Sequence, residues 1–303
     1  MRIASLLPSV TEIVCGIGLA DQLVAVTHEC DFPKEVARLP RVTRSKLPQA
    51  ISSSEIDQLV KEQLEVDQSL YYLDTEVLRQ VRPDLIITQT LCEVCAVNRN
   101  EVDSAIHSLD PRPKVLDLEP TRLSEVLESI LSVGVQTGRE SQAINYLQQL
   151  ESRVRLVDQN KEKLSGTPTV ALLEWIDPLY TAGHWNPELI QLAGGQDLFG
   201  NVGARSRQIK WNDLTEADPD YILIACCGFS IQRTLQEVEI LQSRPDWRQL
   251  NAVKRNQVFV ADGSSYFNRP GPRLVDSLEI VSALLSAAEN LPNQACIRLP
   301  STV

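Results

Sequence analysis

The chain has 303 residues, of which 43% are hydrophobic and 23% are charged, and its formal net charge is −11 at pH 7. This length exceeds what one compact core usually spans, so we expect two lobes. The acidic balance and the lack of a basic run argue against a nucleic-acid partner. The chain opens without the apolar stretch of an export signal and contains no membrane span, which predicts a cytoplasmic protein, or a periplasmic one if the true start lies upstream. We also expect a monomer.

Short apolar strands alternate with helices over the first 120 residues. The run DLIITQ at 84–89 is typical of a buried strand, and the serine run that opens 52–66 is typical of a helix N-cap. The expected strands are 2–7, 23–27, 84–89 and 115–118, and the expected helices are 10–19, 52–66 and 73–81.

Residues 121–166 contain no proline and repeat apolar residues at helical spacing, which predicts two consecutive helices. Thr137 and Glu140 have the spacing of a capping box, so we expect the second helix to begin there. At about 1.5 Å per residue it would be roughly 40 Å long, enough to join two lobes.

The last part of the chain repeats the order of the first. RPDLII at 82–87 corresponds to DPDYIL at 218–223, and both follow a predicted helix. The expected strands are 169–173, 220–225 and 258–261, and the expected helices are 187–193, 209–217 and 275–291.

This alternation predicts an α/β fold of two Rossmann-like lobes with parallel sheets, joined by a single long helix. The expected parts are an N-terminal lobe at 1–120, linking helices at 121–166 and a C-terminal lobe at 167–303. Ligands of open α/β sheets bind beyond the carboxyl ends of the strands, so we expect a ligand cleft between the lobes.

Aromatic residues gather after the expected strands, in a chain that is only 5% aromatic. This clustering favours a flat, apolar or conjugated ligand that stacks on rings. An alternative is that Trp175 and Tyr180 are core residues. The candidate ligand-binding residues are Phe32, Trp175, Tyr180, His184, Trp185, Tyr266, Phe267 and Arg269.

Cysteines form a second group of candidates, and the chain contains seven of them. Without an export signal we expect reduced thiols. Cys92 and Cys95 have the C-x-x-C spacing of a metal or redox site, and His28 with Cys30 would complete four zinc ligands if the two loops touch. The alternative is that these thiols line a reduced pocket.

Sequence motifs typical of phosphate-binding loops, dinucleotide sites and nucleophile elbows are missing from the chain. We therefore expect a binding protein and not an enzyme.

Four stretches carry a resemblance that covers nearly the whole chain: RIASLLPSVTEIVCGIGLADQLVAVTHECDFP, PDLIITQ, DPLYTAGHWNPELIQLAGGQDLF and SYFNRPGPRLVDSLEI. These stretches, in this order, resemble the substrate-binding proteins of cobalamin and iron-siderophore ABC importers. The resemblance is strongest to the cobalamin-binding members. The resemblance implies two Rossmann-like lobes joined by one long helix. It also implies a corrinoid ring held by aromatic side chains, at matching positions Tyr180, Tyr266 and Phe267. The helix at 52–66 lies in a stretch that looks like an insertion.

The leading hypothesis is therefore a protein that binds cobalamin or a related corrinoid or tetrapyrrole, with an ABC transporter permease as a candidate partner. Ferric-siderophore binding is one alternative. A cytosolic zinc or iron–sulfur protein with redox or hydrolytic chemistry at Cys92 and Cys95 is another.

Overall fold

The structure is a computed structural model that describes residues 1–48, 51–66, 69–89, 97, 99–162, 164, 166–286 and 295–300. By its internal contacts the chain divides into two compact units. Unit 1 comprises Met1–Ile51, Glu55–Pro120 and Glu125–Gln148, and unit 2 comprises Ser52–Ser54, Thr121–Ser124 and Gln149–Val303. The division therefore does not follow one cut along the chain.

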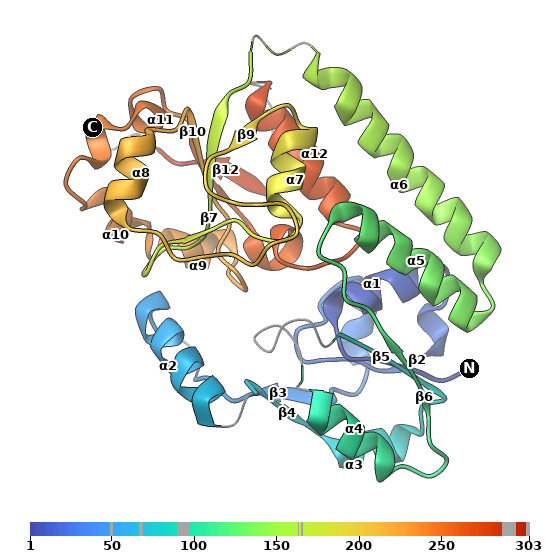
Figure 1. Cartoon of the computed structure of the whole chain (residues 1–303). Coiled ribbons are helices and arrows are strands. Elements are labelled where there is room, and N and C mark those ends of the chain that lie inside the picture. Colours follow the sequence, from blue (N-terminus) through green and yellow to red (C-terminus); the bar gives the residue numbers. More distant parts are fainter. Residues whose placement is uncertain are drawn as a thin grey trace. The chain divides into compact units, whose positions relative to one another are not determined.

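Unit 1 is built on a four-stranded parallel sheet with strand order β2-β1-β5-β6 (Figure 1). The apolar runs predicted as strands form this sheet. Strands of a parallel sheet are covered on both faces, so most of their residues are apolar. Its strands are β1 (Ile3–Ser5), β2 (Leu23–Ala25), β5 (Leu85–Thr88) and β6 (Lys114–Asp117). A separate antiparallel pair consists of β3 (Thr43–Ser45) and β4 (Tyr71–Leu73).

The helices of unit 1 follow its strands, as the alternation predicts. The described ones before the linking region are α1 (Pro8–Gly16), α2 (Ser53–Val66), α3 (Thr75–Val81) and α4 (Arg99–His107). The first residues of α2 are assigned to unit 2. A buried cluster that includes Ala4, Ile86 and Leu78 forms part of the core of unit 1.

Unit 2 contains a mixed sheet with the order β12-β11-β10-β7-β8, and β9 pairs with β7. Its central strands are parallel, as predicted, whereas the short strands β8 and β12, which were not predicted, run antiparallel to their neighbours. The strands are β7 (Thr169–Trp175), β8 (Tyr180–Thr181), β9 (Gln196–Asp197), β10 (Tyr221–Ile224), β11 (Val258–Ala261) and β12 (Cys296–Arg298).

Helices α7 and α12 of unit 2 pack against each other (Figure 1). Helix α12 is predominantly apolar, and most of its side chains are buried. The helices in this part of the chain are α7 (Asn186–Leu192), α8 (Trp211–Ala217), α9 (Ile231–Leu235), α10 (Val238–Gln242), α11 (Asn251–Lys254) and α12 (Leu274–Leu285).

Two helices occupy the linking region, α5 (Leu123–Thr137) and α6 (Glu140–Lys161). The predicted capping box is wrong, because the Thr137 hydroxyl donates to the Val133 carbonyl at 2.7 Å inside α5. With 22 residues, α6 is about 33 Å long, shorter than expected.

Each end of this region has its own anchor. The N–H of Leu123, the first residue of α5, donates to the Glu188 carboxylate at 2.7 Å within unit 2. The boundary between the units falls inside α6, after Gln148. Beyond it, the Arg153 guanidinium pairs with Asp276 and Glu279 of α12.

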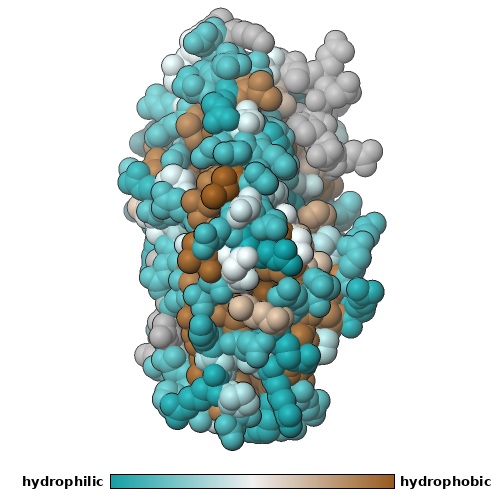
Figure 2. Space-filling view, turned by 90° about the vertical axis from the view of Figure 1, so that its right-hand side faces the viewer, coloured by the Kyte–Doolittle hydropathy of each residue, from teal (hydrophilic) through white to brown (hydrophobic). Residues whose placement is uncertain are grey.

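The face drawn in Figure 2 is mostly hydrophilic, with hydrophobic side chains in small groups. In the part of the chain that the structure describes, no helix combines the length and apolar character needed to cross a bilayer.

Candidate functional site

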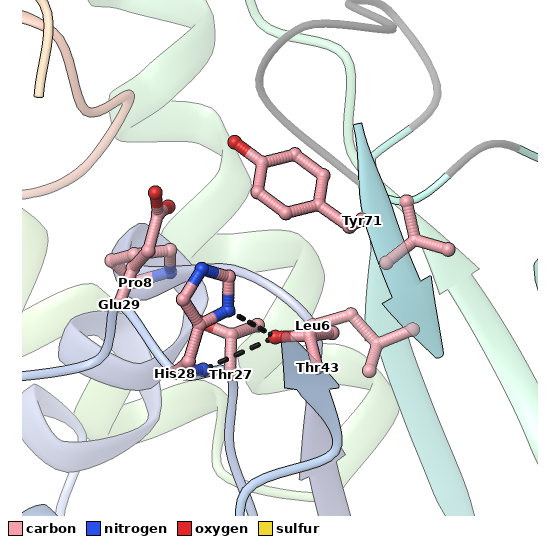
Figure 3. A pocket seen from close by; sticks show the side chains of 8 residues that line it. Leu6, Pro8, Thr27, His28, Glu29, Thr43 and Tyr71 are labelled. Atoms are coloured by element: carbon pink, nitrogen blue, oxygen red, sulfur yellow. Dashed lines mark hydrogen bonds between the residues drawn. The ribbon is translucent and has the colours of Figure 1, made fainter. Parts of the chain in front are cut away.

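A small pocket lies at the carboxyl ends of β1 and β2 in unit 1 (Figure 3). Its volume is about 10 Å³, which is close to the room that one water molecule needs. It is lined by Leu6, Pro8, Thr27, His28, Glu29, Thr43, Tyr71 and Val97. Its position beyond the strand ends is where α/β sheets bind ligands.

His28 is the central polar residue of this pocket, and it is half-buried. Its Nδ1 lies 2.7 Å from the Thr43 hydroxyl, which also accepts the His28 backbone N–H at 3.1 Å. Its ring centroid is 5.5 Å from that of Tyr71. Figure 3 shows the other ring nitrogen directed away from Thr43.

The electrostatic surroundings of His28 favour the neutral imidazole. Burial, and then the positive charge of Arg41, lower the pKa of His28 below its usual value. A neutral imidazole is the form that coordinates metals.

His28 and Cys30 were expected to share a metal site only if their loop met the loop of Cys92 and Cys95. The Cys30 side chain is buried, and its Sγ lies 3.1 Å from the hydroxyls of both Thr11 and Thr27, so it faces the interior and not the pocket. Cys92 and Cys95 lie outside the described residues. Among those that are described, no three His, Cys, Asp or Glu side chains gather as metal ligands. Phe32, in the same loop as His28, is 46% exposed.

In unit 2, Trp175 stands at the carboxyl end of β7 and is half-buried. Its ring centroid lies 4.8 Å from that of Phe229, and its Nε1 donates to the Ser53 carbonyl at 3.1 Å. The Arg233 guanidinium lies 4.3 Å from the centroid of the Phe229 ring. Phe229 was not predicted, although it follows β10 at the kind of position that the strand-end rule selects.

Tyr180 and His184 are also half-buried. Tyr180 lies in β8, paired with Trp175 of β7. His184 adopts a left-handed backbone, with φ of 51°, and its N–H donates to the Ala204 carbonyl. Burial, and then the charge of Arg205, lower the pKa of His184. These residues form a fixed loop beside the end of β7.

Tyr266 and Arg269 follow β11. Tyr266 lies in a single turn of π-helix at Gly263–Phe267, whose start is fixed by the Ser265 N–H donating to Asp262 at 2.7 Å. The Arg273 guanidinium lies 5.4 Å from the centroid of the half-buried Tyr266 ring. Arg269 donates to the Ser264 hydroxyl at 3.3 Å. Tyr266 is therefore a second half-exposed ring at a strand end.

Two predicted ligand contacts are core residues instead. Phe267 is fully buried, and Trp185 is buried with its Nε1 donating to the Phe267 carbonyl at 2.8 Å. Aromatic clustering in the sequence suggested exposed rings for both. In this structure the Trp185 N–H has a buried partner and the Phe267 ring has no exposed surface, so both rings pack inside unit 2. Their role as ligand contacts stays a prediction.

Glu174, next to Trp175, holds the surrounding loops together. Its carboxylate accepts the Gly183 N–H at 2.9 Å and the Asn186 side-chain amide at 2.8 Å. Desolvation of the carboxyl group raises its pKa to about 7, with Asp197 adding to the rise, while these hydrogen bonds oppose it. Sequence analysis missed this residue because nothing local distinguishes it from an ordinary strand-end glutamate.

The fold and these strand-end surfaces define a two-unit α/β solute-binding protein. Comparison with known proteins agrees: residues 3–264 match the periplasmic binding protein family, and the chain belongs to that family. Its members bind solutes, so this chain is a binding protein and not an enzyme.

Three relatives show the range of the similarity. The vitamin B12-binding protein of Vibrio cholerae serotype O1 is 24% identical over 95% of this chain and 90% of its own. The ABC transporter substrate-binding lipoprotein YvrC of Bacillus subtilis is 23% identical over 92% of this chain and 77% of its own. The solved structure of the periplasmic heme-binding protein RhuT of Roseiflexus sp. RS-1 superimposes with a TM-score of 0.70 at 20% identity, covering 95% of this chain and 99% of that one.

Proposed function

We propose that the protein binds a corrinoid or a related tetrapyrrole at the strand ends of its two units. The observation that carries this proposal is the pair of half-exposed rings, Trp175 and Tyr266, at the ends of β7 and β11. Both strands neighbour β10, so β7 and β11 lie about 10 Å apart, and the two rings follow strands that are close enough for one flat macrocycle to reach both. A relative that binds vitamin B12 supports the same ligand class.

A second candidate is a tetrapyrrole or siderophore that carries iron. The neutral His28 beside Tyr71 favours it, because an imidazole nitrogen and a phenol oxygen are both iron donors. The solved heme-binding relative points in the same direction. A metal site at Cys92 and Cys95 stays a prediction, as does the cleft in which the two surfaces would meet.

Titration of the purified protein tests the ligand class. Cyanocobalamin, haemin and a ferric siderophore would each be added while absorbance and heat are recorded. Saturable binding with a Kd of micromolar or below for one of the first two supports the proposal. No saturation below about 1 mM, or roughly −4 kcal/mol, with any of the three would refute it.

A permease of an ABC transporter is the proposed partner, in keeping with the substrate-binding lipoprotein among the relatives. Co-purification of the ligand-loaded protein with such a permease in detergent would test this partner. The cytoplasmic location with reduced thiols, or a periplasmic one if the true start lies upstream, stays a prediction. Fractionation of cells, with maleimide trapping at lysis, would locate the protein and report whether its thiols are reduced.

A further inference from the structure

Ser53 is the first residue of α2 and the only one of that helix that is buried. Its backbone N–H lies 2.9 and 3.1 Å from the two carboxylate oxygens of Glu237. Its carbonyl accepts the Trp175 Nε1–H at 3.1 Å. The backbone N–H and the carbonyl of Ser53 are therefore both bound by side chains of unit 2 that lie more than a hundred residues further along the chain.

The groups that hold Ser53 also hold each other. Glu237 is paired with Arg233, one turn earlier in the chain. The Arg233 guanidinium lies over the Phe229 ring, and that ring contacts Trp175. The contacts thus close on themselves, and we call the set of Ser53, Trp175, Phe229, Arg233 and Glu237 the Ser53 latch.

The negative charge of the Glu237 carboxylate suits the N-terminus of a helix, where backbone N–H groups point outward. A carboxylate that accepts backbone N–H groups makes hydrogen bonds roughly twice as strong as neutral ones. Glu237 also lies at the positive end of the helix dipole of the 14-residue α2. The Glu237 carboxylate thereby caps α2 through the Ser53 N–H.

Apolar packing contributes little to holding this helix. The apolar side chains of α2, which include Ile56, Leu59 and Val60, are half-buried at most. Opening the latch therefore exposes no buried apolar side chain of α2. Such a segment is drawn from the low-stability end of a structure, where local opening occurs.

We propose that the Ser53 latch gates the ring of Trp175. In the ligand-free protein it holds residues 52–54 against the indole, and a ligand that stacks on Trp175 must first displace them. The proposal rests on the proposed function in that Trp175 is taken as a ligand contact. It adds a regulatory step, because only the unlatched fraction binds, and the observed association rate is scaled by that fraction.

Hydrogen exchange of the ligand-free protein tests the latch itself. Glu237→Gln removes the charge and one acceptor oxygen where several donors converge, so amide exchange at residues 53–57 should rise about tenfold or more. Trp175→Phe keeps a ring on Phe229 but removes the indole N–H, and should raise exchange in the same segment. Glu239→Gln changes an exposed residue of α10, two positions after Glu237, and is the matched control that should change nothing. Unchanged exchange in both latch variants would overturn the proposal.

Stopped-flow mixing with cyanocobalamin or haemin tests the gate. The association rate of Glu237→Gln should rise by the factor by which exchange rises, while that of Glu239→Gln stays at the wild-type value. Faster exchange with an unchanged or slower association rate would show that the latch does not gate the ring. If neither compound binds the wild-type protein, the proposed function fails, and the exchange experiment alone then judges the latch.

Discussion

Gly134 of α5 and Ala143 of α6 lie so close that a Cβ added to Gly134 would be 2.4 Å from the Cβ of Ala143. Both residues are in unit 1. A glycine inside a helix costs about 1 kcal/mol relative to alanine, so its presence here reflects the close approach of the two helices.

We expect Gly134→Ala to lower the free energy of unfolding by about 1–3 kcal/mol, since overpacking outweighs the gain in helix propensity. The double variant Gly134→Ala, Ala143→Gly moves one methyl group across the contact and should recover most of the loss. Urea unfolding measures both. A single variant more stable than the wild type would show that the helices separate without cost.

The raised pKa of Glu174 predicts that stability falls as pH rises. The pKa of Glu174 is about 7 in the folded protein, against 4.5 for an unperturbed glutamate in the unfolded chain. The folded protein therefore retains a proton that the unfolded chain releases. This contribution is fully present below about pH 4.5 and is lost as pH rises to about 7. Its size should be on the order of 1–3 kcal/mol.

Glu174→Gln should remove that pH dependence, because the amide does not titrate, and should make the protein at least as stable as the wild type at pH 8. Urea unfolding at intervals between pH 5 and pH 8 would measure the slope, with the exposed Glu239→Gln as control. A wild-type slope that survives in Glu174→Gln belongs to another group.

Arg153 should matter more to stability than its neighbour Arg155. Its Nε donates to Glu279 at 2.8 Å, and its guanidinium also pairs with Asp276. Arg153→Met leaves two carboxylates without their cation. Because the Arg153 side chain is 35% exposed, the expected loss is only about 1–2 kcal/mol.

Arg155→Met is the matched control, since that side chain is 63% exposed and its oxygen partner on Glu151 is 3.7 Å away. It should cost less than about 0.5 kcal/mol. Thermal unfolding compares the two variants. Equal losses would mean that Arg153 acts as an ordinary surface residue.

Thiol labelling should separate Cys227 from the buried cysteines. Cys227 is exposed, whereas burial raises the pKa of both Cys226 and Cys296 to about 12 and leaves little thiolate to react. In a Cys92→Ser, Cys95→Ser background, maleimide should modify Cys227 first, and Cys30, Cys226 and Cys296 only after unfolding. Mass spectrometry of the labelled peptides reports the order. Persistence of the fast phase after Cys227→Ser would contradict it.

Periodicity and apolar runs were sufficient to predict the main strands. DLIITQ and DYILIA contain β5 and β10, because a strand covered on both faces has an apolar signature that needs no context. Two-residue strands such as β8 and β9 carry no such signature, and they were missed.

The candidate site was harder to predict, because its contacts join residues far apart in the chain. The strand-end rule found Trp175 and Tyr266, but it does not distinguish a ring that faces solvent from one that turns into the core, as Phe267 does. The Ser53 contact with Glu237 spans 184 residues. A local pattern could only suggest that the serine run caps its own helix.

The two carboxylates that receive helix starts, Glu237 for Ser53 and Glu188 for Leu123, also set the order in which unit 2 is completed. Chains are synthesised from the amino terminus, so residues 52–54 and 121–124 leave the ribosome well before the carboxylates that hold them. Unit 2 therefore reaches its final form only by recruiting segments made long before it. A fragment beginning at residue 149 would contain both carboxylates without the N–H groups they bind, and it should be less stable alone than in the presence of residues 1–148.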